Sequence, residues 1–354
     1  MRSKRYIFHL LCFLFFLIAQ KAYCIDNKEP IEEDKGFNAG KTIMEHIGDA
    51  HEWHILKYGE THVSIPLPVI LYDEGKIVAF MSSNFHHGEA DYKGYKLDEK
   101  GKIIRADGSE KKPLDFSITK NVLSLFISIA LICWIFISIT RRFKKHRYEP
   151  PRGLQSWLEP LIIFVRDDIA RPSIGDKKYE KYMPFLLTIF FFIFINNLLG
   201  LIPFFPGGAN LTGNIAVTMV LALFTFIITT FSGNKHYWKE IYNAPGVPWW
   251  LKAIPLMPIV EIIGVITKPF VLMVRLFANI TAGHIIALGF ISLIFIFGAM
   301  APAAGYGFSI ISVFFYVFMG LLELLVAFIQ AYVFTLLSSL YFGMATAEHH
   351  TEEH

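Results

Sequence analysis

Five ionisable side chains and two amides interrupt an otherwise apolar stretch near the C-terminal end of this 354-residue chain. Arg275 is the most informative of them, because an arginine at bilayer depth costs roughly 2.5–3.5 kcal/mol on insertion scales. Its guanidinium stays protonated at every accessible pH, so it is a fixed positive charge and not a proton carrier. Such a charge is suited to attracting a carboxylate that passes it in the membrane. The seven residues are Glu261, Lys268, Arg275, Asn279, His284, Glu323 and Gln330.

The first four of these residues follow one side of a predicted helix. Glu261, Lys268 and Arg275 are seven residues apart, and Asn279 is one turn beyond Arg275. Arg275 is far from both ends of its apolar segment, which argues against an arginine that merely reaches a lipid headgroup. For Asn279 an ordinary polar contact between helices is the alternative. The stripe therefore predicts a functional face centred on Arg275.

Glu323 and Gln330 repeat the seven-residue spacing on a second predicted helix. If the two helices pair antiparallel about a turn near residue 303, His284 lies level with Glu323 and Arg275 lies level with Gln330. Buried polar groups need such partners, because an unpaired one costs several kcal/mol in lipid. The sequence therefore predicts two polar pairs, with a simply packed histidine as the alternative for His284.

The composition is that of a membrane protein. Hydrophobic residues make up 54% of the chain and charged residues 18%, whereas a soluble domain averages about 25% charged residues. A net charge of +3 is too small to indicate nucleic acid binding. Cys12, Cys24 and Cys133 are too scattered for a disulfide framework or a metal site, and we expect no cofactor. The sequence has no P-loop motif, so we expect nucleotide catalysis to belong to partner subunits.

The apolar runs predict an all-α polytopic membrane protein with about five membrane-embedded helices. Three have ordinary lengths, over residues 116–140, 183–204 and 214–232. Two helices of about 40 residues, over 255–300 and 305–345, would each be about 60 Å long, twice the hydrocarbon thickness. They must therefore tilt steeply as a long hairpin. Charges interleaved with apolar residues over 152–170 predict an interfacial helix.

The N-terminal part is predicted to be exported. Residues 1–24 have the basic start, apolar centre and small-residue end of a signal peptide, with an uncleaved anchor as the alternative. Residues 25–115 are polar, and turns at 73–75 and 99–101 predict two β-hairpins. We expect the histidines of this segment to be solvated; a metal site shared by His51 and His54 on a helix face is the alternative. We assign the segment no chemistry.

Basic residues indicate the orientation. Five of them lie within 141–147 and three more at Lys235, Lys239 and Lys252, which predicts that both places are cytoplasmic. The linker 203–213 has no basic residue and is expected outside. We therefore expect residues 25–115 to be extracytoplasmic and the C-terminus to be cytoplasmic.

The motifs around the ionisable residues resemble subunit a of the rotary ATP synthases, of the bacterial F type. The segments 268–270, 275–279 and 282–284 closely resemble that family's signature, and 323–334 resembles its final helix. The segments 197–203 and 214–218 resemble its middle helices, so the resemblance covers about residues 115–354. Gly200 stands where some relatives have an acid. His284 and Glu323 are exchanged in other relatives, which supports a functional pair.

The resemblance implies a stator subunit in a bacterial inner membrane, whose residues 116–354 offer two offset aqueous half-channels to the carboxylates of a rotating c-ring. Arg275 would be the fixed charge that prevents a direct proton leak and couples ion flow to rotation, and Gln330 and Asn279 would orient it. The implied partners are the c-ring, subunit b of the peripheral stalk, the remaining ATP synthase subunits and the lipid bilayer.

The resemblance also distributes the other polar residues between the two half-channels. His284 and Glu323 would line the outer channel, and Glu261 would line the inner one. For Lys268 a side chain that reaches the membrane surface is the alternative. Asn214 and Thr218 could bind channel water or equally complete a helix contact, and Asn197 is a further candidate.

A secondary transporter that couples its substrate to intramembrane charge pairs is the main alternative function. It predicts an inverted repeat with broken helices in both halves, whereas the intramembrane charges here lie only in the last third. A purely structural subunit is a second alternative, and it leaves Arg275 unexplained. The sequence does not distinguish protons from Na⁺, because the c subunit supplies the ion-binding carboxylate.

Overall fold

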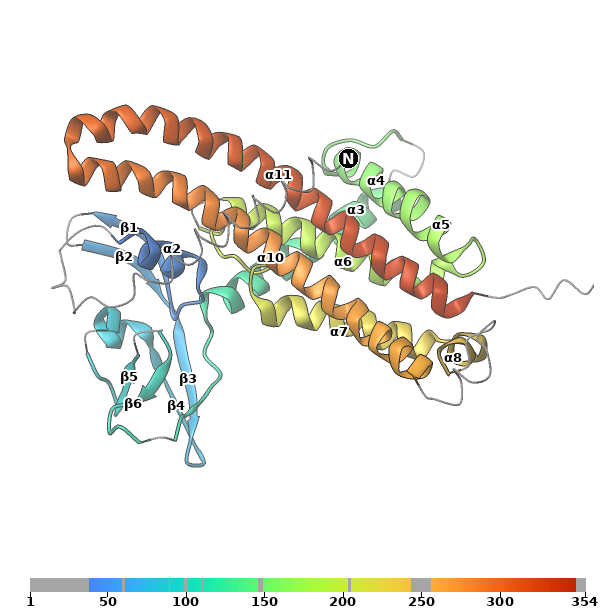
Figure 1. The fold of residues 1–354 in the computed structure, drawn as a ribbon, viewed down its shortest axis with the longest axis horizontal. Helices are drawn as coiled ribbons and strands as arrows, with labels where there is room; N and C mark the ends of the chain where they lie inside the picture. Colours follow the sequence, from blue (N-terminus) through green and yellow to red (C-terminus); the bar gives the residue numbers. More distant parts are fainter. Residues whose placement is uncertain are drawn as a thin grey trace, which may run out of the picture. The chain divides into compact units, whose positions relative to one another are not determined.

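The computed structural model describes residues 38–347 except 59–60, 89, 99–100, 110, 146–148, 203–204 and 243–255 (Figure 1). The predicted signal peptide (1–24), Lys252 and the C-terminal residues 348–354 lie outside the described residues. Within the described part, five helices are long and apolar enough to cross a membrane. This confirms the predicted class, an all-α polytopic membrane protein with a small β-containing N-terminal part.

The described residues of the N-terminal part form one short helix, a 3-10 helix and seven strands. The helix α2 (Ala39–Ile47) precedes β1 (Glu52–Tyr58), β2 (Thr61–Pro66), β3 (Pro68–Asp73) and β4 (Lys76–Met81), which are followed by the 3-10 helix η1 (Ser82–Gly88), β5 (Tyr95–Leu97), β6 (Ile103–Arg105) and β7 (Leu114–Asp115).

The helical part then follows in one run. Its elements are α3 (Lys120–Lys145), α4 (Leu154–Phe164), the π-helix η2 (Val165–Ala170), α5 (Arg171–Ile174), α6 (Tyr179–Leu201), α7 (Ile215–Ser232), α8 (Lys235–Tyr242), α10 (Leu256–Met300) and α11 (Pro302–Thr346).

Helix ends differ from the expected ones for local reasons. The first span begins at Lys120 and not at 116, because the segment before it is held by the N-terminal part: Thr119 donates a hydrogen bond to Asp49, and Ala50 accepts one from the Lys120 amide. It also continues through the basic residues to Lys145. α6 ends at Leu201 and not at 204, because Ile202 precedes a proline and takes an extended conformation. α8 was not predicted.

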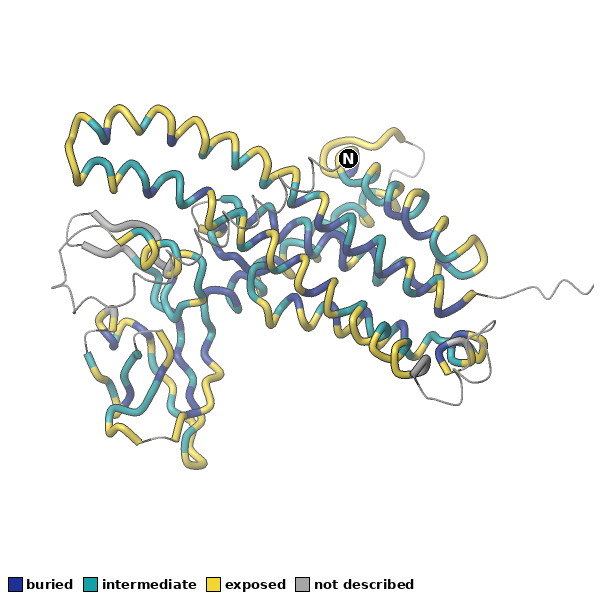
Figure 2. The backbone as a smooth tube through the Cα atoms, viewed as in Figure 1, coloured by how far each residue is buried: buried dark blue, intermediate teal, exposed yellow. Residues whose placement is uncertain are grey.

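α6 lies at the centre of the hydrophobic core. In the apolar 18-residue stretch of α6, 44% of the residues are buried, whereas 11% are buried in the corresponding stretches of α10 and α11. Leu186, Phe190, Phe191 and Ile193 have no exposed surface, and their neighbours come from α11, η2 and α3. Figure 2 shows this contrast as dark blue along α6 and yellow along much of α10 and α11. The two long helices therefore leave a large apolar surface uncovered by the chain itself.

Only Ala301 separates α10 from α11, so the two helices form the predicted antiparallel hairpin. The gap expected between the helices ending at residue 300 and beginning at residue 305 was too long. Pro302 is tolerated at the start of α11, where its missing N–H needs no partner. Gly305 lies within α11. The position requires a glycine, because a Cβ there would be 2.7 Å from the Gly298 Cα. Each helix has 45 residues and is about 68 Å long, so the hairpin fits a bilayer only when steeply tilted.

Both predicted β-hairpins are present. Glu74 and Gly75 form the two-residue turn between β3 and β4, and both have positive φ, 48° and 83°, as the tight hairpin turn requires. β5 pairs antiparallel with β6. A third hairpin, β1 with β2, was not predicted. The buried residues of this part are Val69, Leu71, Phe85, Tyr95 and Ile103.

The structure contradicts the alternative metal site of His51 and His54, and for His51 it also contradicts the expected solvation. The helix that His51 and His54 were to share is absent, because His54 lies within strand β1. His51 is not solvated: its side chain is 9% exposed and its Nε2 lies 2.9 Å from a carboxylate oxygen of Asp115. Among the described residues no group of three metal-ligating side chains comes together.

Candidate functional site

Arg275 lies on the exposed side of α10. Leu272 and Leu276, on the opposite side, are each 1% exposed, whereas the neighbouring Val271 and Val274 are 41% and 36% exposed. Within the described part of the chain no side chain forms a hydrogen bond or ion pair with Arg275. A guanidinium has five N–H donors and is costly to leave unpaired in lipid. Arg275 therefore requires an acceptor from outside the described part of the chain.

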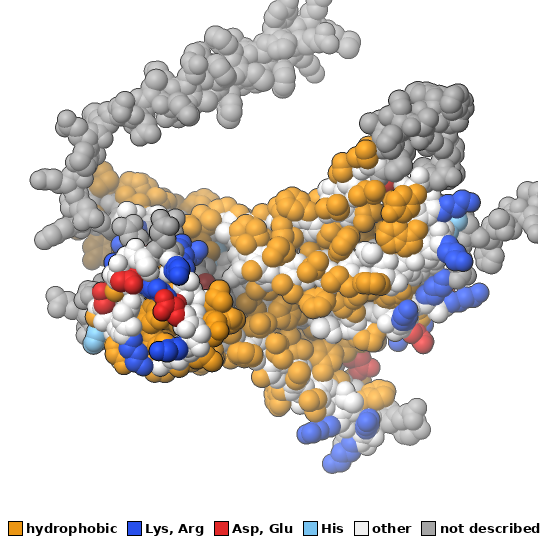
Figure 3. Space-filling model, turned by 90° about the horizontal axis from the view of Figure 1, so that it is seen from below, with side chains coloured by type: hydrophobic (Ala, Val, Ile, Leu, Met, Phe, Trp, Pro, Cys, Tyr) orange, Lys and Arg blue, Asp and Glu red, His pale blue; other side chains and the backbone are white. Residues whose placement is uncertain are grey.

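The apolar surface around Arg275 belongs to both long helices. Figure 3 shows apolar side chains over much of the helical part, with Lys and Arg gathered towards its ends. On α11, Leu321, Leu325 and Ile329 are 63%, 55% and 39% exposed. Asn279 is exposed on α10, like Arg275. The site is thus an uncovered apolar helix face that carries one permanent charge.

The predicted pair of Arg275 with Gln330 is not formed among the described residues. Gln330 is 6% exposed and faces the interior, whereas Arg275 faces outwards. The helical spacing gave the depth of both residues along the hairpin but not the direction of their side chains. The part of Gln330 in orienting the guanidinium stays a prediction.

The predicted pair of His284 with Glu323 is formed. The Nδ1 atom of His284 lies 3.5 Å from the Oε1 atom of Glu323, and the two side chains are 16% and 12% exposed. Gly283 permits this approach, because a Cβ at that position would lie 2.8 Å from Glu323 Oε1. The antiparallel register inferred from the sequence is therefore correct at this level.

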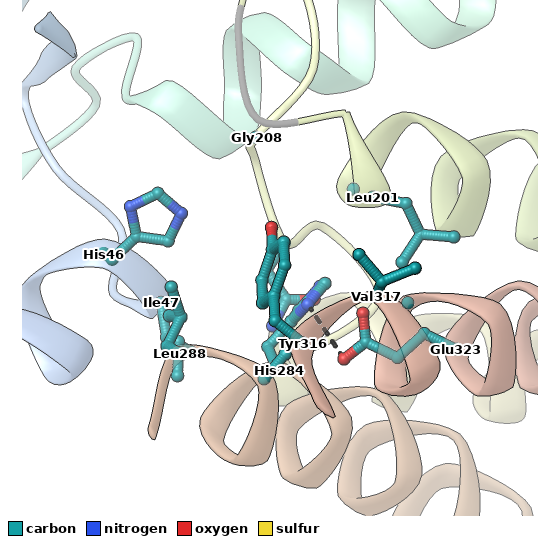
Figure 4. Close-up of a pocket in the computed structure, with 13 residues that line it drawn as sticks. His46, Ile47, Leu201, Gly208, His284, Leu288, Tyr316, Val317 and Glu323 are labelled. Atoms are coloured by element: carbon teal, nitrogen blue, oxygen red, sulfur yellow. Dashed lines mark ion pairs between the residues drawn. The ribbon is translucent and has the colours of Figure 1, made fainter. Parts of the chain in front are cut away.

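The pair borders a cavity of ≈ 250 Å³ (Figure 4). Two buried polar atoms there, Glu323 Oε1 and Asn210 Nδ2, have no hydrogen-bond partner among the described residues. A water molecule needs only about 10–15 Å³ of such space and two or more polar partners. The cavity can therefore hold several waters beside an ionisable pair. Its lining residues include His46, Gly200, Asn210, His284, Tyr316 and Glu323.

Three other candidate residues have structural hydrogen bonds. The Asn197 amide donates to the Ala327 carbonyl of α11 and accepts from Thr212 at 2.6 Å. Asn214 caps α7 by accepting from the Ala216 amide, and Thr218 donates to the carbonyl of Ile215 within its own helix. These contacts explain why the polar residues are tolerated, and contact with channel water stays a prediction.

The two remaining candidates lie on the half of α10 that precedes Arg275. Lys268 Nζ lies 5.6 Å from the centre of the Tyr341 ring on α11, within the range of a cation–π contact. Glu261 is half-buried. At 1.5 Å per residue, Glu261 lies about 21 Å before Arg275 along the helix axis, and His284 about 13 Å after it.

Sequence reasoning missed three polar residues of the cavity, His46, Asn210 and Tyr316. Asn210 stands in a glycine-rich linker and Tyr316 in an apolar helix, where neither residue type is unusual. His46 is far from the long helices in sequence, so only the tertiary structure shows that it lies beside them. No spacing signal within the sequence connects these residues.

Comparison with known proteins gives two matching family models, one for the ATP synthase A chain over residues 122–343 and one for a domain of unknown function over residues 42–122. The chain is 42% identical over 258 residues to "ATP synthase subunit a" of Chloroherpeton thalassium, which covers 71% of this chain and 73% of that protein. It is 44% identical to "ATP synthase subunit a 2" of Prosthecochloris aestuarii, over 66% of this chain and 70% of that protein. It is 43% identical to "ATP synthase subunit a" of Myxococcus xanthus, over 68% and 77%.

Proposed function

This chain belongs to the ATP synthase A chain family, and from that premise we propose that it guides protons to and from the carboxylates of a rotating c-ring. As a member of this family it is a multi-pass membrane subunit of an ATP synthase and not the catalytic subunit. Family membership also decides against a secondary transporter.

The observation that carries the proposal is the position of Arg275, exposed on an apolar helix face without an acceptor among the described residues. An ionised carboxylate on a c subunit would supply that acceptor, in the charge-assisted geometry that guanidinium groups favour. A charged carboxylate is costly in lipid, so only a protonated c subunit leaves Arg275 and rotates through the bilayer. Each elementary charge that crosses the membrane down its potential releases about 2.3 kcal/mol of free energy per 100 mV.

The two half-channels lie on opposite sides of Arg275 along α10. We assign the inlet to the cavity beside His284 and Glu323, where unpaired polar atoms border space for water. We assign the exit to the end of α10 that carries Glu261. Because Arg275 stands between them, a proton passes from one to the other only on a c subunit.

The proposed topology follows the basic residues. α3 ends in Arg142, Lys144 and Lys145, which we place on the cytoplasmic side of a bacterial inner membrane. The N-terminal part is then extracytoplasmic and the C-terminus cytoplasmic. We expect subunit b of the peripheral stalk to hold this chain against the torque of the c-ring.

Cysteine accessibility tests the two half-channels. In a background with the native cysteines replaced by serine, Ala287→Cys in the inlet cavity should react with a water-soluble thiol reagent added from outside. Glu261→Cys should react from the cytoplasmic side. Ile227→Cys, exposed on α7 and expected in lipid, is the control and should react from neither side. Reaction of Ala287→Cys and Glu261→Cys from the same side would contradict two offset channels.

A further inference from the structure

The N-terminal helix α2 forms part of the inlet cavity. His46 and Ile47, in its last turn, line the same cavity as His284 of α10 and as Tyr316 and Glu323 of α11. α2 packs against α10. Figure 4 shows the His46 ring beside the cavity that the His284 and Glu323 side chains enter. A segment to which sequence reasoning gave no chemistry thus brings an imidazole to the proposed channel.

Hydrogen bonds to the start of α3 hold α2 in this place. The Lys120 ammonium, which is 6% exposed, donates to the His46 carbonyl at 3.0 Å. The Asp49 carboxylate, just after α2, accepts from the backbone N–H of Asn121 and from the Thr119 hydroxyl. Because the acceptor is a backbone carbonyl, this hydrogen bond holds the backbone at the end of α2 in place, and not merely a side chain that could rotate. The position of His46 is therefore determined by the membrane part.

The two nitrogens of His284 face different surroundings. Nδ1 lies towards Glu323, whereas Nε2 lies towards Gly200, where an added Cβ would be 3.6 Å away. Gly200 lines the cavity and offers no side chain to that nitrogen. An imidazole can accept a proton on one nitrogen and release one from the other. His284 can thus take a proton from cavity water on one side and exchange with Glu323 on the other.

We infer that the N-terminal domain builds the outer wall of the proton inlet, and that His46 passes protons between external water and the His284–Glu323 pair. This inference rests on the proposed function and deepens it. In the described part of the chain, the titratable and charged groups near His46 include Lys120 from α3, which donates to its backbone carbonyl, and Asp49, three residues further along the chain. They also include three residues that line the same cavity: His284 from α10, and Tyr316 and Glu323 from α11. An unperturbed imidazole titrates at about 6.5, so it exchanges protons readily near neutral pH.

The test measures ATP synthesis by the whole complex in proteoliposomes, driven by a potassium diffusion potential at equal pH on both sides. His46→Ala should slow synthesis roughly tenfold, less than the about hundredfold that positioned acid–base groups contribute to a chemical step, because cavity water still conducts protons. The pH dependence of the synthesis rate should also change, because the variant lacks an imidazole that takes up and releases protons. Added imidazole should restore synthesis, whereas a bulky buffer of similar pKa should not.

His86→Asn is the matched control, because His86 is exposed in the same domain and Asn tolerates its positive φ of 45°. It should behave as the wild type. Wild-type synthesis by His46→Ala at every pH would overturn the inference. Slow synthesis with an unchanged pH profile and no imidazole rescue would also overturn it, since His46 would then be only structural. Arg275→Ala, measured in parallel, tests the proposed function separately: synthesis by that variant would refute the function whatever His46 does.

Discussion

The proposed site combines two charged groups in opposite surroundings. Arg275 is exposed on its helix and has no hydrogen-bond or ion-pair partner among the residues that the structure describes. His284 and Glu323 are largely enclosed and lie 3.5 Å apart, so each determines the charge that the other can hold. In a low-dielectric channel, removal of one partner leaves the other uncompensated. In the proposed function, Arg275 acts on the c-ring, and the His284–Glu323 pair acts on the supply of protons to it.

We predict that exchanging the inlet pair is tolerated better than breaking it. His284→Leu and Glu323→Leu should each impair ATP-driven proton pumping, because one ionisable group stays without its partner. His284→Glu with Glu323→His keeps one acid and one imidazole at the same depth and should pump better than either half of the exchange. The coupling free energy from the double-mutant cycle should be roughly 0.5–3 kcal/mol. Strictly additive losses would show that the two residues do not act as a pair.

Helical spacing predicted part of this site and could not predict the rest. It placed His284 level with Glu323, and their contact confirms that register. It also placed Arg275 level with Gln330, but one side chain faces outwards and the other inwards. Periodicity reports depth along a helix, whereas the direction of a side chain depends on what packs around it. The sequence could not predict that His46 lies at the cavity for the same reason, because its position depends on how a distant segment packs.

Among the elements, the α10–α11 hairpin determines where the five ionisable candidate residues, Asn279 and Gln330 lie. Near its turn the backbones are in close contact at Gly298 and Gly305, and the Phe297 and Phe308 rings are stacked with centroids 3.8 Å apart. Sequence reasoning ended the first helix at residue 300 and began the second at residue 305, and it gave neither Gly298 nor Gly305 a packing role. The glycines are instead required by packing, which no local signal reveals.

We predict that Gly305→Ala destabilises the hairpin by about 1–3 kcal/mol, since its Cβ would meet the backbone of Gly298. Gly307→Ala is the matched control, because nothing lies within 4 Å of its Cβ, and it carries the same gain in helix propensity. The measurement is the thermal stability and yield of the assembled complex. Equal stability of the two variants would contradict the close approach of the two helices.

The contact between the β4–β3–β7 sheet and the β5–β6 sheet of the N-terminal part should weaken in acid. Hydrogen bonds from Arg105 hold the pKa of Asp73 below its ordinary value of 3.8, against the opposing effect of burial. A carboxylate with a lowered folded pKa stabilises the fold above its unfolded pKa, and this contribution is lost as the pH falls through the folded pKa. Hydrogen exchange of β3 and β6, corrected for intrinsic rates, should therefore increase below pH 3.8. Asp73→Asn should abolish that dependence; an unchanged acid response in this variant would contradict it.

Across the whole molecule, the helices differ in burial: some form the core, and others expose an apolar face. α6 is enclosed by its neighbours, whereas α10 and α11 expose apolar side chains along most of their length. Composition and apolar runs were enough to predict five spans and the long hairpin. They could not show which helix is central, because a helix that is apolar all round fits either lipid or a protein interior. The uncovered face of the hairpin, with Arg275 on it, is where the account places the c-ring.

ATP-driven proton pumping by an assembled complex with Arg275→Ala tests the central claim most directly. The complex should assemble, since Arg275 faces outwards and forms no hydrogen bond or ion pair within the described chain, but pumping should be abolished. Arg275→Lys should fail as well, because a desolvated lysine can lose its proton and its charge. Lys268→Ala, which removes a cation two turns away on the same helix, is the control and should keep most of the activity. Pumping at the wild-type level by the assembled Arg275→Ala complex would contradict the account.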